Sequence, residues 1–167
     1  MREEISEVVE GLLRKMVGLL RKHWGDNLVS VVLFGSVARG DFESASDIDL
    51  FIVCRSFPRE YTKRTAAFVE IECMLWEDMD AVEERYDFYP CFSAILKTQQ
   101  EAQRFSRLYL DMQEEARILY DRDGFFSDVL AHFRRKLKEL GATKKTIGRR
   151  WYWDLKPDLK PGEVIRL

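Results

Sequence analysis

Two aspartates separated by one residue begin an otherwise apolar segment of the chain. Asp47 and Asp49 lie in the run Asp47–Cys54 (DIDLFIVC). Side chains two residues apart in a strand point to the same side of the sheet, so these carboxylates should project together. Their repulsion would raise each pKa unless a cation lies between them. Because Mg²⁺ is often held by one or two carboxylates together with substrate phosphates, the pair predicts a magnesium site.

The residues before the pair offer a place for phosphate. Gly35 and Ser36 directly follow the apolar run Leu28–Phe34. Glycine lets the backbone approach a ligand closely. Ser36 would begin a short helical turn, whose free N–H groups favour a phosphate. Either feature alone is common in structural turns and on solvated strand faces, but the combination indicates a polyphosphate site beside a metal-binding carboxylate pair.

This segment resembles the signature of the DNA polymerase beta-like nucleotidyltransferase superfamily, in its minimal nucleotidyltransferase form. The residues that match are Gly35, Ser36, Arg39, Gly40, Asp41, Ser46, Asp47 and Asp49. The resemblance implies transfer of a nucleoside monophosphate from a nucleoside triphosphate, most simply ATP, to an acceptor hydroxyl, with release of pyrophosphate. It implies that Asp47 and Asp49 are catalytic and bind Mg²⁺.

The same resemblance assigns nucleotide binding to Gly35, Ser36, Arg39 and Ser46. For Arg39 two roles stay open, because its guanidinium could neutralise phosphate charge or pair with Asp41. The resemblance also implies partners: small members of the superfamily are often paired with an all-helical protein, and some act as antitoxins that adenylylate a toxin.

A third carboxylate is missing from the place where it is expected. Superfamily members that catalyse transfer usually carry one on the next core strand, which here is Phe92–Thr98 and contains no acid. Ser93 or Ile95 stands where the third carboxylate is expected. Asp87 before the strand and Glu101 after it are the two acids that could take its place. The alternative to an enzyme is therefore a nucleotide-binding or partner-binding module, antitoxin-like, that does not catalyse transfer.

The positions of the apolar residues predict the elements that hold this site. The order predicts an α/β (α+β) fold with a small mixed sheet of about four strands packed with helices. The expected strands are Leu28–Phe34, Asp47–Cys54, Phe92–Thr98 and Ala116–Tyr120, and the expected helices are 3–23, 37–39, 58–85, 99–114 and 125–140.

The chain beyond Gly141 shows no clear period. We expect residues 1–141 to form the nucleotidyltransferase-like domain and residues 142–167 to form an extended aromatic and basic tail packed on it. Residues 144–153 combine four cations with three aromatic residues, a composition that can bind single-stranded nucleic acid or a nucleobase. The same aromatic residues can instead anchor the tail, which is the interpretation we favour.

Composition limits the classes of partner. The 27 Lys and Arg are balanced by 29 Asp and Glu, so no global basic field would hold nucleic acid. Three cysteines without a CxxC pair favour free thiols in a reducing cytoplasm. The acidic start of the sequence predicts no signal peptide, and no apolar run is long enough to predict a membrane span. The apolar stripe of helix 3–23 is consistent with either a core contact or a homodimer.

Overall fold

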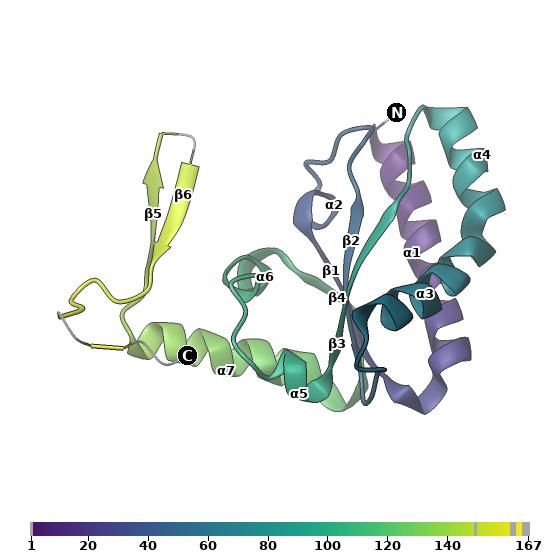
Figure 1. Ribbon diagram of the computed structural model, residues 1–167. Coiled ribbons are helices and arrows are strands. Elements are labelled where there is room, and N and C mark those ends of the chain that lie inside the picture. Colours follow the sequence, from purple (N-terminus) through teal and green to yellow (C-terminus); the bar gives the residue numbers. More distant parts are fainter. Residues whose placement is uncertain (1, 149, 161–162, 165–167) are drawn as a thin grey trace.

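The computed structural model describes residues 2–148, 150–160 and 163–164, and shows helices on both faces of one sheet (Figure 1). The elements, in chain order, are α1 (Arg2–Trp24), β1 (Leu28–Phe34), α2 (Gly35–Arg39), β2 (Ile48–Cys54), α3 (Tyr61–Glu72), α4 (Trp76–Tyr86), β3 (Phe92–Thr98), α5 (Gln99–Ala102), α6 (Tyr109–Glu115), β4 (Arg117–Asp121), α7 (Phe125–Glu139), β5 (Thr143–Ile147) and β6 (Arg150–Asp154). Short 3-10 turns lie at Gly25–Asn27, Cys73–Leu75 and Arg122–Gly124.

The main sheet has four strands in the order β3-β2-β1-β4. β1 is antiparallel to both β2 and β4, whereas β2 and β3 are parallel. The mixed α+β fold is therefore confirmed. The two central strands are buried along almost their whole length, as their apolar sequences predicted. β2 begins at Ile48, one residue later than expected.

Alternate residues of the central strands contribute to two cores. In β2, Leu50 and Ile52 pack on the side of α1, α3 and α4. Phe51 and Val53 pack on the opposite side, against residues of α6 and α7. This alternation follows from the two-residue period of a strand. It places the side chain of Asp49 on the same face of the sheet as Phe51 and Val53.

The long first helix belongs to the core. Its apolar stripe is buried against the sheet through Val9, Leu12, Leu13, Met16 and Leu20. The sequence left a core contact and a homodimer contact open for this helix, and in the structure the stripe makes the core contact. No helix within the described residues is long and apolar enough to cross a membrane.

Two helices that the sequence predicted as continuous are broken. The predicted helix 58–85 is divided by the turn Cys73–Leu75 into α3 and α4. The predicted helix 99–114 ends at Ala102 and resumes at Tyr109. The second break has a local cause, because the Tyr109 hydroxyl donates a 2.6 Å hydrogen bond to the carbonyl of Ala102. That bond satisfies a carbonyl at the end of α5.

Side chains of α3 cover the free edge of β3. The Glu72 carboxylate accepts a hydrogen bond from the N–H of Phe92, and Arg64 donates to the carbonyl of Leu96. An open strand edge is a template for unwanted pairing. The contacts from α3 block that pairing.

The pair formed by Arg64 and Glu101 should make stability depend on pH. The guanidinium of Arg64 is 8 % exposed and donates to Glu101 at 2.7 and 3.0 Å. Its hydrogen bonds lower the pKa of Glu101 from 4.5 to about 2. The ionised Glu101 therefore contributes its full stabilisation of the fold above pH 4.5. This contribution is lost as the pH falls from 4.5 towards 2, because the carboxylate becomes protonated. Glu101→Gln should lower the free energy of unfolding by roughly 2 kcal/mol at pH 7, measured by urea denaturation.

An exposed ion pair at the start of α3 provides the control. Glu60 and Lys63 lie 3.2 Å apart with side chains 59 % and 66 % exposed. Glu60→Gln should change the unfolding free energy by less than about 0.5 kcal/mol. The prediction for Glu101 is wrong if both variants lose the same stability at pH 7 and show the same acid dependence.

The C-terminal segment, in which the sequence showed no clear period, contains two strands. β5 and β6 form a separate two-stranded antiparallel hairpin, which projects beside the main body in Figure 1. Trp153 and Leu155 pack at its base against the second core, and Lys144 makes a 2.6 Å ion pair with Glu114 of α6. Every residue of β5 is exposed, so this strand carries no apolar alternation. The domain boundary after residue 141 stays a prediction.

Candidate active site

The turn after β1 touches one of the two aspartates. Phe34, the last residue of β1, is paired with Asp49 of β2, so Gly35 follows directly beside it. Gly35 has φ +76°, a left-handed conformation that favours glycine. A Cβ at this position would clash with Oδ2 of Asp49 and lie 3.2 Å from its Cγ. Only a glycine leaves room for the Asp49 carboxylate in its present position.

The two aspartates lie close enough to influence each other. Burial raises the pKa of Asp49, a hydrogen bond with Ser93 opposes the rise, and the charge of Asp47 adds to it. The Asp49 side chain is half-buried, while Asp47 is exposed just before β2. The structure thus brings Asp47, Asp49 and Gly35 together. An anionic pair of this kind attracts a cation.

Ser36 lies in the first turn of α2. The N-terminus of this helix receives no hydrogen bond from a capping side chain. Ser36 is half-buried beside Gly35, and its carbonyl accepts hydrogen bonds from Gly40 and from Asp41 at 3.1 Å. The turn is thereby closed at its C-terminal end. The first N–H groups of a helix have no acceptor within the helix itself. Phosphate binding by Ser36 stays a prediction.

Arg39 makes ion pairs with two acids. Its Nε donates to Asp41 at 3.1 Å and its Nη1 donates to Glu115 of α6 at 2.9 Å. Hydrogen bonds to Glu115 and Asp41 raise the pKa of Arg39. The positive charge also lowers the pKa of Asp49, so the guanidinium lies near the aspartate pair. Of the two roles that the sequence left open, the pairing with Asp41 is present; phosphate binding stays a prediction.

Ser46 belongs to a turn in the loop before β2. Its hydroxyl accepts a 2.8 Å hydrogen bond from the N–H of Glu43, and its own N–H donates to the Glu43 carbonyl. These bonds fix the approach of the chain to Asp47. In the structure Ser46 has this role in the turn, and its predicted contact with nucleotide stays a prediction.

Ser93 is the residue across from Asp49 on β3. The parallel register pairs the two residues directly, and Ser93 counteracts the rise in the pKa of Asp49. Glu101 lies beyond the opposite end of β3, where it binds Arg64 and Thr98. Asp87 ends α4 and lines a depression with Asp41 and Glu43. Within the described residues, no group of three or more acidic, His or Cys side chains could hold a metal ion.

Helix α6 contributes two acids that the sequence did not assign to the site. Glu115 pairs with Arg39, and Asp111 lies one turn earlier on the same helix. Burial raises the pKa of Asp111, with the charge of Glu115 adding to the rise. The four-residue spacing predicts that the two acids share a helix face. It cannot show that this face meets Arg39, because the contact between α6 and α2 depends on the tertiary fold.

The family assignment agrees with this geometry. Residues 13–116 match the family described as nucleotidyltransferase domain, and the matched range includes every residue predicted for the site. The chain belongs to this family of nucleotidyltransferase domains. The predicted superfamily is thus confirmed.

Two relatives come from the archaeon Methanocaldococcus jannaschii. The chain is 24 % identical over 137 residues to "Putative protein adenylyltransferase MJ1305", covering 81 % of this chain and 87 % of that protein. It is 36 % identical over 55 residues to "Putative protein adenylyltransferase MJ0141", covering 33 % of this chain and 52 % of that protein.

Solved structures with a similar fold include components of toxin–antitoxin complexes. One, from a toxin–antitoxin crystal structure with AMP-PNP, is 17 % identical with a TM-score of 0.44, and the match covers 77 % of this chain and 92 % of that one. Another comes from a complex of a tri-AMPylated Shewanella oneidensis HEPN toxin with its MNT antitoxin. It is 15 % identical with a TM-score of 0.40, and the match covers 84 % of this chain and 93 % of that one.

Proposed function

We propose that the protein transfers a nucleoside monophosphate, most simply AMP from ATP, to a hydroxyl group of an acceptor protein. The observation that carries the proposal is the contact between Gly35 and Asp49, which joins the turn after β1 to the carboxylate pair. The nucleotidyltransferase family supports the reaction class. A protein as acceptor is supported by the name of the first relative, with which the chain shares 137 aligned residues.

The residues present fit Mg²⁺. Asp47 and Asp49 supply hard oxygen donors. Asp49 is half-buried, and its carboxylate occupies the space that a side chain at position 35 would need. Two carboxylates are enough for Mg²⁺ when substrate phosphates and water complete the coordination. When bound, the metal would neutralise the phosphates and stabilise the charge on the attacking and leaving oxygens.

The chain's own residues would position the nucleotide. The backbone N–H groups at the start of α2 and the Ser36 hydroxyl would bind the β- and γ-phosphates. Ser93 would keep the Asp49 carboxylate in its present orientation. Arg39 would remain beside the phosphates, held in place by Glu115 and Asp41. Free thiols at Cys54, Cys73 and Cys91 agree with the proposed cytoplasmic location.

Neutralising the aspartate pair tests the binding step. The double variant Asp47→Asn/Asp49→Asn should weaken binding of Mg²⁺-ATP by at least about 100-fold, since the metal loses both anionic ligands. Isothermal titration calorimetry would measure this. The matched control is Asp121→Asn, because Asp121 accepts hydrogen bonds from Ser30, Phe126 and Ser127 instead of lying at the site. Equal affinity in wild type and the double variant would refute the nucleotide site.

A module without catalysis is the second candidate. It is favoured by one observation, that Ser93 stands opposite Asp49 where a third carboxylate would complete the metal site. Incubation with labelled ATP, Mg²⁺ and cell extract distinguishes the two candidates. Label on a protein that is lost in the double variant supports transfer. Tight nucleotide binding without label, with any of the four nucleoside triphosphates, supports the module.

A further inference from the structure

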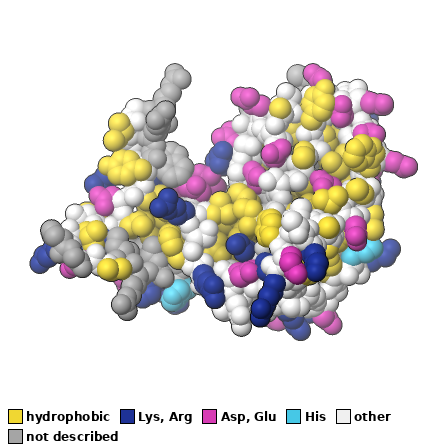
Figure 2. Space-filling model, in the orientation of Figure 1, with side chains coloured by type: hydrophobic (Ala, Val, Ile, Leu, Met, Phe, Trp, Pro, Cys, Tyr) yellow, Lys and Arg dark blue, Asp and Glu magenta, His cyan; other side chains and the backbone are white. Residues whose placement is uncertain are grey.

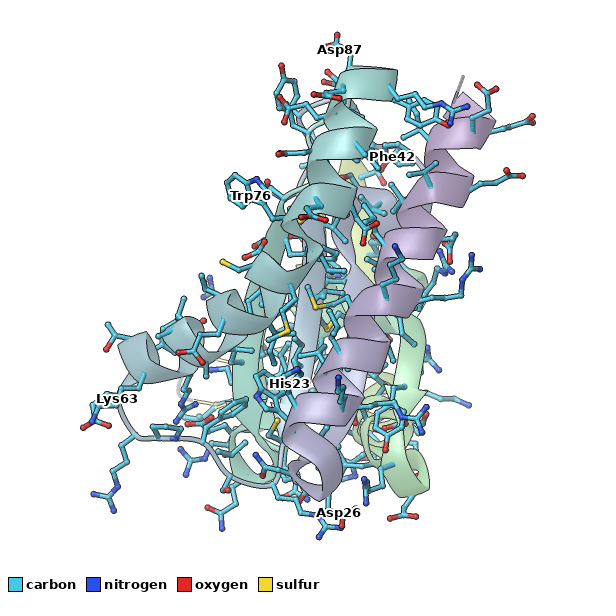
Figure 3. The ribbon with its side chains drawn as sticks, turned by 90° about the vertical axis from the view of Figure 1, so that its right-hand side faces the viewer. His23, Asp26, Phe42, Lys63, Trp76 and Asp87 are labelled. Atoms are coloured by element: carbon cyan, nitrogen blue, oxygen red, sulfur yellow. The ribbon has the colours of Figure 1, made fainter. Side chains whose placement is uncertain are left out.

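Exposed apolar side chains lie along α3, α4 and the segment that leads to β3. Five of the eleven large hydrophobic residues exposed among the described residues lie there: Tyr61, Val69, Met74, Trp76 and Tyr89. We call this group the α3–α4 surface. Trp76 is 63 % exposed and extends outward from the start of α4, on the side away from α1 (Figure 3). Its indole N–H is held by Asp80 at 2.9 Å.

The α3–α4 surface adjoins the strand beside the metal-binding aspartates. Glu72, at the end of α3, accepts the N–H of Phe92, and Phe92 is paired with Ile48 between the two aspartates. Neighbouring strands lie about 4.8 Å apart, so the end of α3 is one strand away from the site. Burial raises the pKa of Cys91, and the charges of Glu72 and Asp47 add to the rise, which places both acids near one thiol.

The segment that carries these apolar residues has a net negative charge, although one of its acids, Asp78, is paired with Lys15 of α1. Between residues 61 and 89 the sequence has eight Asp and Glu but only three Lys and Arg. One of the three cations, Arg64, is buried in its pair with Glu101. Figure 2 shows acidic side chains along the upper right of the visible face, where α4 lies. Complementary potentials favour association, so a partner of this surface should be cationic.

We propose that the α3–α4 surface docks the acceptor protein through a segment whose apolar side chains are flanked by Lys or Arg. The segment would lie against Val69 and Trp76, with its cations facing Glu70 and Glu77. Its hydroxyl-bearing residue would then pass around the edge of β3 to reach Asp49, whose side chain lies on the opposite face of the sheet from α3 and α4. This inference rests on the proposed function, because it names the part of the protein that brings the acceptor hydroxyl to the site.

A protein fits this surface better than nucleic acid does. Eight acids in one segment repel a phosphate backbone, whose binding depends on neutralising cations. A second copy of this chain is the competing occupant, since residues 125–167 carry eleven Lys and Arg against five Asp and Glu. The experiment must therefore measure self-association as well as binding.

Synthetic peptides test the docking directly. The probe is an amphipathic peptide of Leu and Lys with one central Tyr, labelled with a fluorophore; the matched peptide has every Lys replaced by Glu. We expect the full chain to bind the Lys peptide at least about 10-fold more tightly by fluorescence anisotropy. Trp76→Ala should weaken binding about 10-fold or more, as expected for a central aromatic contact. Glu70→Lys/Glu77→Lys should reverse the preference between the two peptides.

Ile118→Ala is the control, because Ile118 is 40 % exposed on β4, at the opposite edge of the sheet. The proposal is overturned if no peptide binds, if Trp76→Ala and Ile118→Ala behave alike, or if Trp76→Ala dissociates a dimer of the chain in sedimentation analysis. Asp47→Asn/Asp49→Asn should bind the Lys peptide normally. If wild type binds the peptide through Trp76 but binds no Mg²⁺-ATP, the docking surface stands and the proposed transfer fails.

Discussion

Replacing Gly35 by Ala should reduce nucleotidyl transfer by roughly 100-fold, although the change adds a single methyl group. The new Cβ would clash with Oδ2 of Asp49, so the carboxylate must move away from its position beside Asp47. Displacing a reacting group or ligand by about 1 Å is enough for a loss of this size. The measurement is AMP transfer to an acceptor, together with calorimetric titration of Mg²⁺-ATP.

Gly40 provides a control matched in backbone conformation. Its φ is +74°, against +76° for Gly35, but a Cβ at Gly40 meets no atom within 4 Å. Gly40→Ala therefore has the same kind of backbone strain without the clash. Both variants should lose about 1 kcal/mol of stability, and only Gly35→Ala should lose nucleotide binding. Equal losses of activity would mean that strain in the turn, and not the position of Asp49, limits the reaction.

The sequence predicted the parts of the fold that are determined by local patterns. β1 and β2 are buried on both faces, and their uninterrupted apolar runs indicated this. The contact between Gly35 and Asp49 could be anticipated from the strand–turn–strand order, since adjacent antiparallel strands bring their connected ends together. The orientation of the site thus follows from residues within one short segment.

Features that depend on tertiary contacts were not predictable in this way. The break between α3 and α4 contains neither Gly nor Pro, so no residue signalled it. β5 is exposed along its whole length and shows no apolar period. The pairing of Arg39 with Glu115 joins residues 76 positions apart. In each case the residues are visible in the sequence, but their contacts are set by the tertiary fold and cannot be read from local patterns.

Introducing a carboxylate with Ser93→Asp should complete the metal site. The parallel register places residue 93 directly beside Asp49, on the same face of the sheet. We expect Mg²⁺ to bind roughly 10-fold more tightly, because a third hard oxygen ligand is added. Transfer should become faster as well if the protein is an enzyme with an incomplete site. Calorimetry with Mg²⁺ and ATP, and the rate of AMP transfer, would measure the two effects.

The effect of this change on thermal stability should depend on whether the metal is bound. Without Mg²⁺ three carboxylates repel one another, so Ser93→Asp should melt at a lower temperature than wild type. With saturating Mg²⁺ the tighter binding should offset this loss through linkage. Ser93→Asn has nearly the same shape without the charge and should show neither effect. If Ser93→Asp and Ser93→Asn both weaken Mg²⁺ binding, the Ser93 hydroxyl beside Asp49 is the required group. The two aspartates, together with the substrate phosphates, would then already form a complete site.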